Sequence, residues 1–262
     1  MNRNALREKL ETLYRKYNKR EFIHPDPLEF LYLYDDIRDR EIVGLLASSL
    51  AYGRVAQINL SVEKALTRMK NSPRDFVLNS SEKEIIKSFC GFKHRFTTGE
   101  ELAGMFIGAK HAIERFGSLN DCFLAGYYHD HETVMPAISE FGASIGFCNE
   151  NICKFLLPRP SAGSACKRLN LYLKWLVRKD DVDPGGWKGI SKSKLIIPLD
   201  VHMFRIGANL GLTERKQANL KTAIEITEAF KKISPDDPTK YDFVLTRFGI
   251  RSDFDEREIY SK

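Results

Sequence analysis

The chain has 262 residues, 43% hydrophobic and 29% charged, with a net charge of +6, which is typical of a globular protein with a sizeable core. No apolar run approaches the ~20 residues of a membrane span, and the charged N-terminus lacks the apolar centre of a secretory signal. We therefore expect a cytoplasmic protein with no membrane partner, acting as a monomer.

Hydrophobic periodicity predicts helices along most of the chain, at residues 3–18, 27–31, 39–53, 55–70, 73–78, 81–89, 99–116, 118–126, 131–145, 161–179, 201–211, 217–232 and 238–248. Glycines and a proline predict a loop at 182–194, and the short apolar run at 195–198 an extended connector. Strand signals are poor. The fold class is therefore all-α, one unit over residues 1–262 with lobes at 39–160 and 161–250, and the N-terminal helices are expected to pack on the second lobe.

The five cysteines, Cys90, Cys122, Cys148, Cys153 and Cys166, form no Cys-x-x-Cys pair. Their odd number and spacing argue against a disulfide framework, a structural zinc site or an iron–sulfur cluster. The six histidines also lack metal-ligand spacing. We expect reduced thiols and neither a metal nor a cofactor.

Positive charge is concentrated in one region. Between residues 159 and 194, nine lysines and arginines stand against three aspartates, and nine minus three equals +6, the net charge of the whole chain. Such a cluster is typical of a polyanion-binding surface. For a bare cluster, a solvated basic face without a partner is the simpler interpretation.

Asp200 stands at a junction in LIIPLDVHMFRIGANLGL, between an apolar run and an amphipathic helix. Because Pro198 disfavours helix before it and the periodic pattern starts at Val201, Asp200 is predicted to cap the helix. Its carboxylate would accept a backbone N–H at the second or third helical position, which holds it anionic and in one orientation. For an isolated aspartate, capping alone is the simpler role.

Lys167 lies near the start of the predicted helix 161–179. The positive helix end and the neighbouring Arg168 disfavour another cation, which favours a nucleophilic amine. A solvated or phosphate-binding lysine is the alternative. Together, an amine and a fixed carboxylate can form a Schiff base at a sugar carbon and stabilise its oxocarbenium character.

The segments LPRPSAGSACKRLNLYL and IIPLDVHMFRIGANLGL resemble the signature of the helix-hairpin-helix DNA glycosylase superfamily. Lys167 matches the lysine of members with lyase activity, and Asp200 matches the aspartate that opens a later helix. The positions after Asp200 also match the family pattern, at Val201, His202, Phe204 and Arg205. The 33-residue spacing from Lys167 to Asp200 is closer to the archaeal 8-oxoguanine glycosylase/lyase branch, and the whole chain is similar to a bacterial branch of conserved hypothetical proteins.

The chain also departs from the pattern of that superfamily. Its hairpin has one glycine, Gly163, where the family has two, and no C-terminal cysteine cluster follows. Members of the family also have a residue that fills the gap left in the duplex by the extruded base. That residue is not identifiable here, and Arg54 and Gln57 are weak candidates. For His202, helix packing is the simpler role.

The resemblance implies a two-lobed helical fold and a glycosylase with lyase activity on damaged duplex DNA, with an oxidised purine as one candidate base and RNA as another partner class. Lys167 would attack the deoxyribose C1′, and Asp200 would stabilise the developing charge. The expected nucleic-acid contacts are Arg54, Gly163, Ser164, Arg168, Lys188, Lys192 and Lys194. Base-pocket candidates are Trp187 and Trp175, although core packing is the simpler role for Trp175.

Two alternatives to this enzyme remain. One is a non-catalytic DNA- or RNA-binding helical protein that retains the glycosylase fold, which the altered hairpin favours. The other is a helical scaffold that binds no nucleic acid.

Overall fold

The computed structural model describes residues 3–146, 156–251 and 253–260. Helices make up 62% of the structure and strands 2%, so the all-α prediction is confirmed. In the described part of the chain, no helix combines the length and the apolar character that crossing a bilayer requires.

The first group of helices precedes residue 147 and comprises α1 (Arg3–Tyr17), η1 (Arg20–Phe22), η2 (Pro27–Leu33), α2 (Ile37–Ser49), α3 (Val55–Met69), α4 (Pro73–Asn79), α5 (Glu82–Phe89), α6 (Gly99–Phe116), α7 (Leu119–Leu124) and α8 (Met135–Gly146). The second group comprises η3 (Pro160–Ala162), α9 (Lys167–Val177), η4 (Lys192–Lys194), α10 (Val201–Asn209), α11 (Leu220–Lys231), α12 (Asp242–Ile250) and α13 (Arg257–Tyr260). A short antiparallel hairpin pairs β1 (Lys93–His94) with β2 (Thr97–Thr98).

Several helices begin at a side-chain cap that satisfies an otherwise free backbone N–H. Ser81 and Thr98 form capping boxes with Glu84 and Glu101, at the starts of α5 and α6. Such i to i+3 pairs are visible in the sequence, which is why most predicted boundaries lie close to the observed ones.

The largest boundary difference concerns the predicted helix 161–179. The α-helix begins only at Lys167, because η3, a left-handed Gly163 (φ 75) and a left-handed Cys166 (φ 46) precede it. The hairpin β1–β2 and α13 were not predicted, because segments this short carry no detectable periodicity. Of the cysteines, Cys90, Cys122 and Cys166 are free thiols, whereas Cys148 and Cys153 lie outside the described residues.

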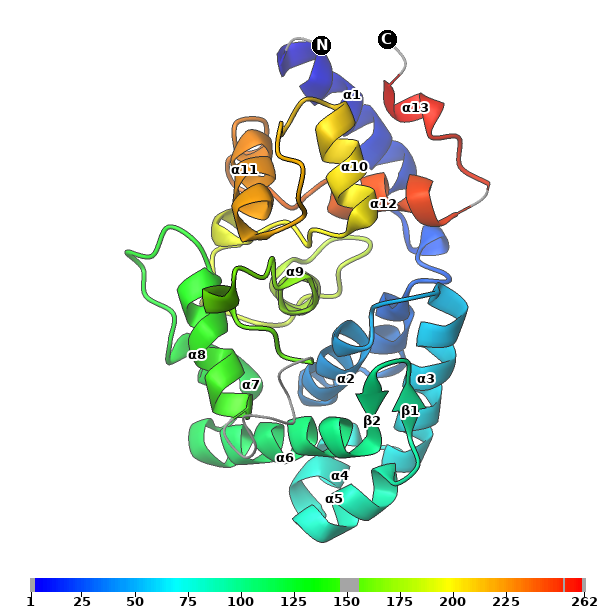
Figure 1. Ribbon diagram of the computed structural model, residues 1–262, viewed down its shortest axis with the longest axis vertical. Coiled ribbons are helices and arrows are strands. Elements are labelled where there is room, and N and C mark those ends of the chain that lie inside the picture. Colours follow the sequence, from blue (N-terminus) through cyan, green and yellow to red (C-terminus); the bar gives the residue numbers. More distant parts are fainter. Residues whose placement is uncertain (1–2, 147–155, 252, 261–262) are drawn as a thin grey trace.

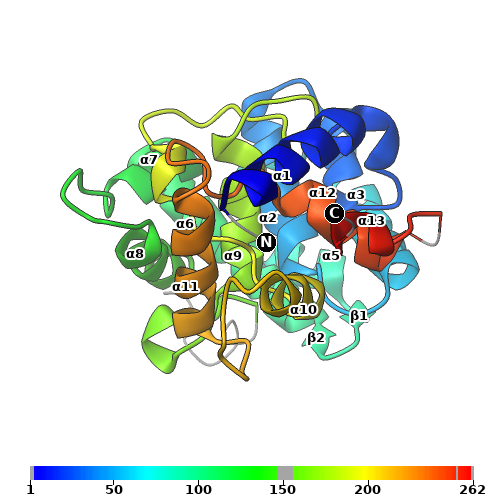
Figure 2. The same cartoon turned by 90° about the horizontal axis from the view of Figure 1, so that it is seen from above.

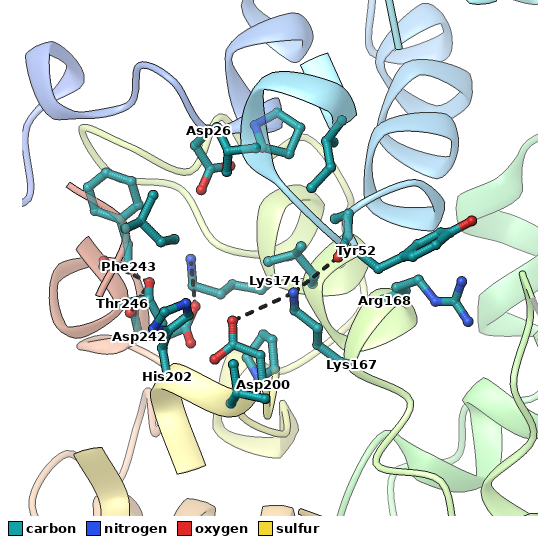
Figure 3. A pocket seen from close by; sticks show the side chains of 18 of the residues that line it. Asp26, Tyr52, Lys167, Arg168, Lys174, Asp200, His202, Asp242, Phe243 and Thr246 are labelled. Carbon is teal, nitrogen blue, oxygen red and sulfur yellow. Dashed lines mark hydrogen bonds and ion pairs between the residues drawn. The ribbon is translucent and has the colours of Figure 1, made fainter. Parts of the chain in front are cut away.

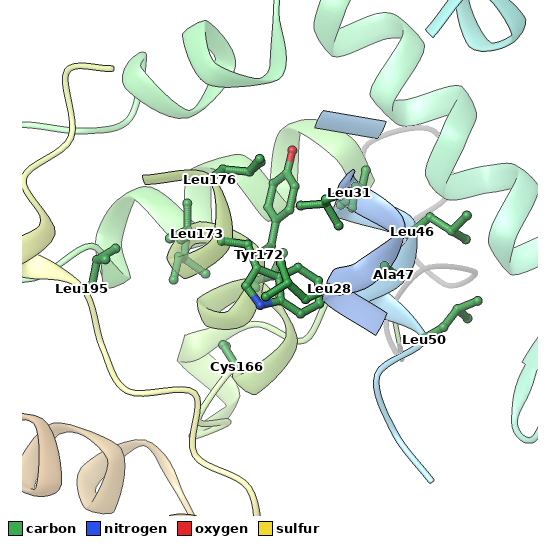
Figure 4. Packing of buried hydrophobic residues seen from close by; sticks show 14 of the residues in the cluster. Leu28, Leu31, Leu46, Ala47, Leu50, Cys166, Tyr172, Leu173, Leu176 and Leu195 are labelled. Atoms are coloured by element: carbon green, nitrogen blue, oxygen red, sulfur yellow. The ribbon is translucent and has the colours of Figure 1, made fainter. Parts of the chain in front are cut away.

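The central contact of the fold joins α2 to α9 (Figure 4). A Cβ atom on Gly44 would lie 3.1 Å from Cε2 of Tyr172, so the glycine allows the two helices to approach closely. The buried hydroxyl of Tyr172 donates to the carbonyl of Glu41 at 3.1 Å. This contact determines where the first turn of α9 lies relative to the end of α2.

In Figure 1, α9 is seen end-on in the middle of the molecule, with α2 to α8 below it and α10 to α13 above it. Helix α1 packs on α12 in the upper part. Glu11 accepts hydrogen bonds from Lys240 and Tyr241, both at 2.6 Å. The N-terminal helix thus joins the part of the chain that follows α9.

Candidate functional site

A cavity of about 530 Å³ opens where the C-terminal end of α2 meets the N-terminal ends of α9 and α10 (Figure 3). Its volume lies within the roughly 300–1,000 Å³ usual for small-molecule sites. Helix α12 closes one side. The residues that line it with charged or polar side chains are Asp26, Tyr52, Ser164, Lys167, Arg168, Lys174, Asp200, His202, Asp242, Thr246 and Arg247.

The structure brings Lys167 and Asp200 together in this cavity. Nζ of Lys167 lies 3.6 Å from Oδ2 of Asp200, and their side chains are 31% and 17% exposed. Asp200 also caps α10, because its Oδ1 accepts the N–H of Met203 at 2.8 Å. One carboxylate oxygen therefore orients the group and the other faces the lysine.

The ammonium of Lys167 has a second partner at the end of α2. Nζ donates to the carbonyl of Ala51 at 3.1 Å, and the guanidinium of Arg168 donates to the carbonyl of Ser49 at 3.3 Å. Carbonyls at a helix C-terminus lack helical partners and carry partial negative charge. The two cations at the start of α9 therefore satisfy the end of α2, and Arg168, an expected phosphate contact, is half-buried.

Behind Lys167, a second lysine and a second aspartate line the cavity, and both are buried. Nζ of Lys174 lies 3.0 Å from Asp183 Oδ1 and 3.6 Å from Asp242 Oδ2. Burial raises the pKa of the Asp242 carboxyl to about 6, with Lys174 opposing and the nearby Asp200 adding to the increase. Oδ1 of Asp242 has no hydrogen-bond partner among the described residues.

The ionic cluster around Lys174 has an excess of acid. In the described chain, Lys174 and Arg178 face four carboxylates, those of Asp180, Asp183, Asp237 and Asp242. Two buried cations neutralise at most two of them fully. An ionised Asp242 is therefore unfavourable for folding, although it supplies a free acceptor at the cavity wall.

Asp242→Asn is expected to raise the unfolding free energy at pH 7.5 by about 1–3 kcal/mol. Because the pKa in the folded protein is raised, to about 6, the cost of ionisation is complete above pH 6 and vanishes near the ordinary carboxyl pKa. The gain should therefore shrink as the pH falls towards 4, measured by urea unfolding at pH 7.5 and 4.5.

The exposed Asp181 provides a control, since Asp181→Asn should change stability by less than about 0.5 kcal/mol. A loss of stability in Asp242→Asn at pH 7.5 would instead mean that the Lys174 ion pair outweighs the burial cost.

The opposite side of the cavity holds an ion pair between Arg247 and Asp26. The buried guanidinium also lies over the ring of Phe243, 4.5 Å from its centroid. Nε of Arg247 has no hydrogen-bond partner among the described residues. The cavity thus presents a buried donor as well as a buried acceptor whose hydrogen-bonding capacity is unused.

Three of the expected nucleic-acid contacts lie at or beside the rim of the cavity. Ser164 lines it, and Gly163 precedes Ser164 and is exposed. Arg54 is exposed between Gly53 and Val55, both of which line the cavity. These residues therefore belong to, or directly adjoin, segments that line the cavity.

Of the four remaining expected contacts, Arg168 lines the cavity, whereas Lys188, Lys192 and Lys194 do not. In Figure 2, the yellow-green loop between α9 and α10 follows the edge opposite α10 and the hairpin. There the backbone N–H of Lys188 donates to Asn120 of α7 at 3.0 Å, and Lys194 donates to the carbonyl of His129 at 2.5 Å. The fold places this loop away from the site.

The tryptophans also separate. Trp175 is buried and lines the cavity, whereas Trp187, the other base-pocket candidate, packs in the core against Phe123 and Tyr172. The prediction that Trp187 contacts a base in the pocket is therefore corrected, and the backbone of its loop explains why. Left-handed Gly185 allows the loop to fold back, and the N–H of Trp187 donates to the carbonyl of Leu176 at 2.8 Å.

Two of the nine cations counted in residues 159–194 do not contribute to a basic surface. Lys174 and Arg178 are buried in ion pairs with aspartates, two of which, Asp237 and Asp242, lie outside that segment. Counting charges along the chain could not detect these partners, because only tertiary packing places them next to Lys174 and Arg178.

Sequence reasoning missed Asp26, Lys174, Asp242 and Arg247 as site residues. The one available signal was in α12, where Asp242 and Arg247 stand in an otherwise mostly apolar stretch, DFVLTRFGI. Charged residues are almost never fully buried unless they are paired. Asp242 and Arg247 therefore indicate a buried polar site, although the sequence does not show which residues they pair with.

These observations define the class as an all-α protein with a lysine–aspartate pair in a cavity between helix ends. A family model described as "Protein of unknown function (DUF2400)" matches residues 26–251, and the chain belongs to this family. The match spans every residue that lines the cavity. No curated protein and no solved structure matches the chain.

Proposed function

We propose that this protein is a DNA glycosylase with lyase activity, which removes a damaged base through a covalent bond to Lys167. The observation that carries the proposal is the 3.6 Å separation between Nζ of Lys167 and the carboxylate of Asp200, inside one cavity. An amine beside a fixed carboxylate is the arrangement that Schiff-base chemistry at a sugar carbon requires.

Asp200 and the Ala51 carbonyl hold Lys167 as an ammonium. An ammonium has no lone pair with which to attack a carbon atom, so the first step is removal of a proton from Nζ. Asp200 is the adjacent proton acceptor. The free amine then attacks C1′ of the deoxyribose, and the bond from C1′ to the base breaks. The base leaves with the bonding electrons and takes the proton from Asp200, which is again a carboxylate.

The lyase step starts from the bond between Nζ of Lys167 and C1′. After loss of a proton from nitrogen, the C1′–O4′ bond opens to a protonated Schiff base, with the electron pair and a proton on O4′. The carboxylate of Asp200 accepts a C2′ proton, and the electron pair of that C–H bond expels the 3′ phosphate by β-elimination. Asp200 carries negative charge beside C1′ while positive charge develops there, which lowers the barrier.

The base is proposed to be recognised by the buried groups behind Lys167. Oδ1 of Asp242 has no hydrogen-bond partner in the described structure, and an unmet buried acceptor favours a ligand that donates to it. An oxidised purine has a ring N–H where the intact purine has only an acceptor, so Asp242 favours the oxidised base. Trp175 and Phe243 supply the apolar wall.

The test is borohydride trapping with the full-length protein. Duplexes with an abasic site, an oxidised guanine or no lesion are incubated with the protein and borohydride, and the adduct is detected as a covalent band. The proposal expects adducts on damaged duplexes only. Duplex binding without an adduct on any lesion would instead support the non-catalytic nucleic-acid-binding alternative.

A further inference from the structure

Arg168 follows Lys167 directly in the chain, and its place in the basic segment makes it an expected phosphate contact. The structure turns its side chain towards the protein instead. Its guanidinium donates to the carbonyl of Ser49 at 3.3 Å and lies over the ring of Tyr52, 5.3 Å from the centroid. Figure 3 shows Arg168 beside Tyr52, on the side of Lys167 away from Asp200. The side chain therefore contacts the end of α2 rather than pointing into solvent.

Both of these partners of Arg168 have fixed positions. Ser49 is the last residue of α2, which packs along α9. The hydroxyl of Tyr52 lies 2.7 Å from both the carbonyl of His94 and Oγ1 of Thr97, one in each strand of the hairpin. A ring that is held at its hydroxyl cannot leave the guanidinium without breaking these hydrogen bonds. Arg168 is thus held between a helix end and a fixed ring.

Lys167 is anchored to the same helix end. Its Nζ donates to the carbonyl of Ala51 at 3.1 Å, two residues after the carbonyl that Arg168 contacts. Carbonyls at a helix C-terminus lack helical partners and carry partial negative charge, so adjacent cations stabilise them. Without the guanidinium, segment 49–52 loses a hydrogen bond that joins it to the first turn of α9, and the Ala51 carbonyl can move relative to Nζ.

The placement of Nζ matters for the reaction proposed above. Nζ of Lys167 lies 3.6 Å from Oδ2 of Asp200, the carboxylate that takes its proton. Misplacing a reacting group by about 1 Å can slow a reaction about 100-fold. A side chain that fixes the Ala51 carbonyl can therefore act on the chemistry through Lys167 without touching the substrate.

We infer that Arg168 is a positioning residue, which aligns the end of α2 so that the Ala51 carbonyl holds the amine of Lys167 in place, and that it does not bind a backbone phosphate. The inference rests on the proposed function, because it concerns the amine that attacks C1′. A planar guanidinium can donate to Ser49 while it lies on the Tyr52 ring, whereas a lysine ammonium is a point charge without that geometry. A phosphate, by contrast, is bound by lysine as well as by arginine.

The experiment compares wild type with Arg168→Lys, Arg168→Gln and Arg38→Lys. Arg38 is the matched control, an exposed arginine in the first turn of α2 that does not line the cavity. The rate constant of borohydride trapping is measured on an abasic-site duplex with the protein in saturating excess. The salt dependence of binding is measured on a duplex with a tetrahydrofuran abasic-site analogue, which cannot form a Schiff base.

Arg168→Lys should slow trapping about tenfold or more, because the amine is less well placed, while the affinity for the analogue duplex stays within about twofold of wild type. Arg168→Gln should slow trapping by a similar factor. Its slope of log K against log[salt] should change by far less than the ~0.9 that one phosphate contact contributes. Arg38→Lys should match wild type in both measurements. Because the protein is in saturating excess, a smaller folded fraction does not lower the rate constant.

Trapping by Arg168→Lys at the wild-type rate would overturn the positioning role. A slope reduced by about 0.9 in Arg168→Gln would overturn it too, and would make Arg168 a phosphate contact. If the Arg168 variants do not fold, Tyr52→Leu removes the ring under the guanidinium and should slow trapping about tenfold, and an unchanged rate contradicts the inference. Failure of the proposed function gives a different result, because the wild type itself then traps no adduct on the abasic duplex.

Discussion

Lys167→Gln is expected to abolish the borohydride-trapped adduct and to slow base removal by more than about 10³-fold. Glutamine keeps a polar N–H donor on a side chain that is one atom shorter, but its amide nitrogen is not nucleophilic. The lost ion pair with Asp200 is partly exposed, so the stability change should stay below about 1 kcal/mol. Single-turnover kinetics and urea unfolding measure the two effects.

Lys188→Gln is the matched control, because Lys188 is exposed and lies on the edge of the molecule away from the cavity. It removes the same charge and should leave both the adduct and the excision rate within about twofold of wild type. An adduct that persists in Lys167→Gln would mean that another amine attacks the sugar, and Lys174 is the other lysine that lines the cavity.

Asp200→Asn should separate the two roles of this residue. Asparagine caps helices about as well as aspartate, so the hydrogen bond to the N–H of Met203 survives and stability changes by less than about 0.5 kcal/mol. The negative charge opposite Lys167 is lost, and the excision rate should fall about 10²- to 10⁴-fold. Asp200→Ala loses the cap too and should cost a further ~1 kcal/mol of stability.

Asn219→Ala controls for the cap alone. Asn219 caps α11 through the N–H of Thr222 at 3.2 Å and does not line the cavity, so its loss should cost ~1 kcal/mol without a fall in excision rate. If Asp200→Asn excises bases at a rate near that of wild type, Asp200 is a cap only.

Much of the secondary structure was predictable, because its determinants are local. Helix periodicity and caps such as Ser81 with Glu84 act between residues three or four positions apart. The start of α9 was predicted six residues early, since the left-handed Cys166 has no marker in the sequence. Glycine is the residue that usually indicates such a backbone.

Within the candidate site, Lys167 and Asp200 were predicted because each stands next to a recognisable helix start. Lys174 and Asp242 were not, since a charge in an amphipathic helix is ordinary unless its burial is known. Trp187 was placed in the site because a glycine-rich loop suggests exposure, yet the same glycines let the loop fold back and bury the ring.

The sequence by itself determined most of the helices, the cap on α10 and the two candidate catalytic residues, because each has a marker within a few positions along the chain. Only the tertiary structure decided that these residues share a cavity. The ammonium of Lys167 contacts a carbonyl 116 positions away in the chain, and this contact exists because Gly44 lets α2 and α9 pack closely. Long-range packing also determines which charges are buried and which basic residues line the cavity.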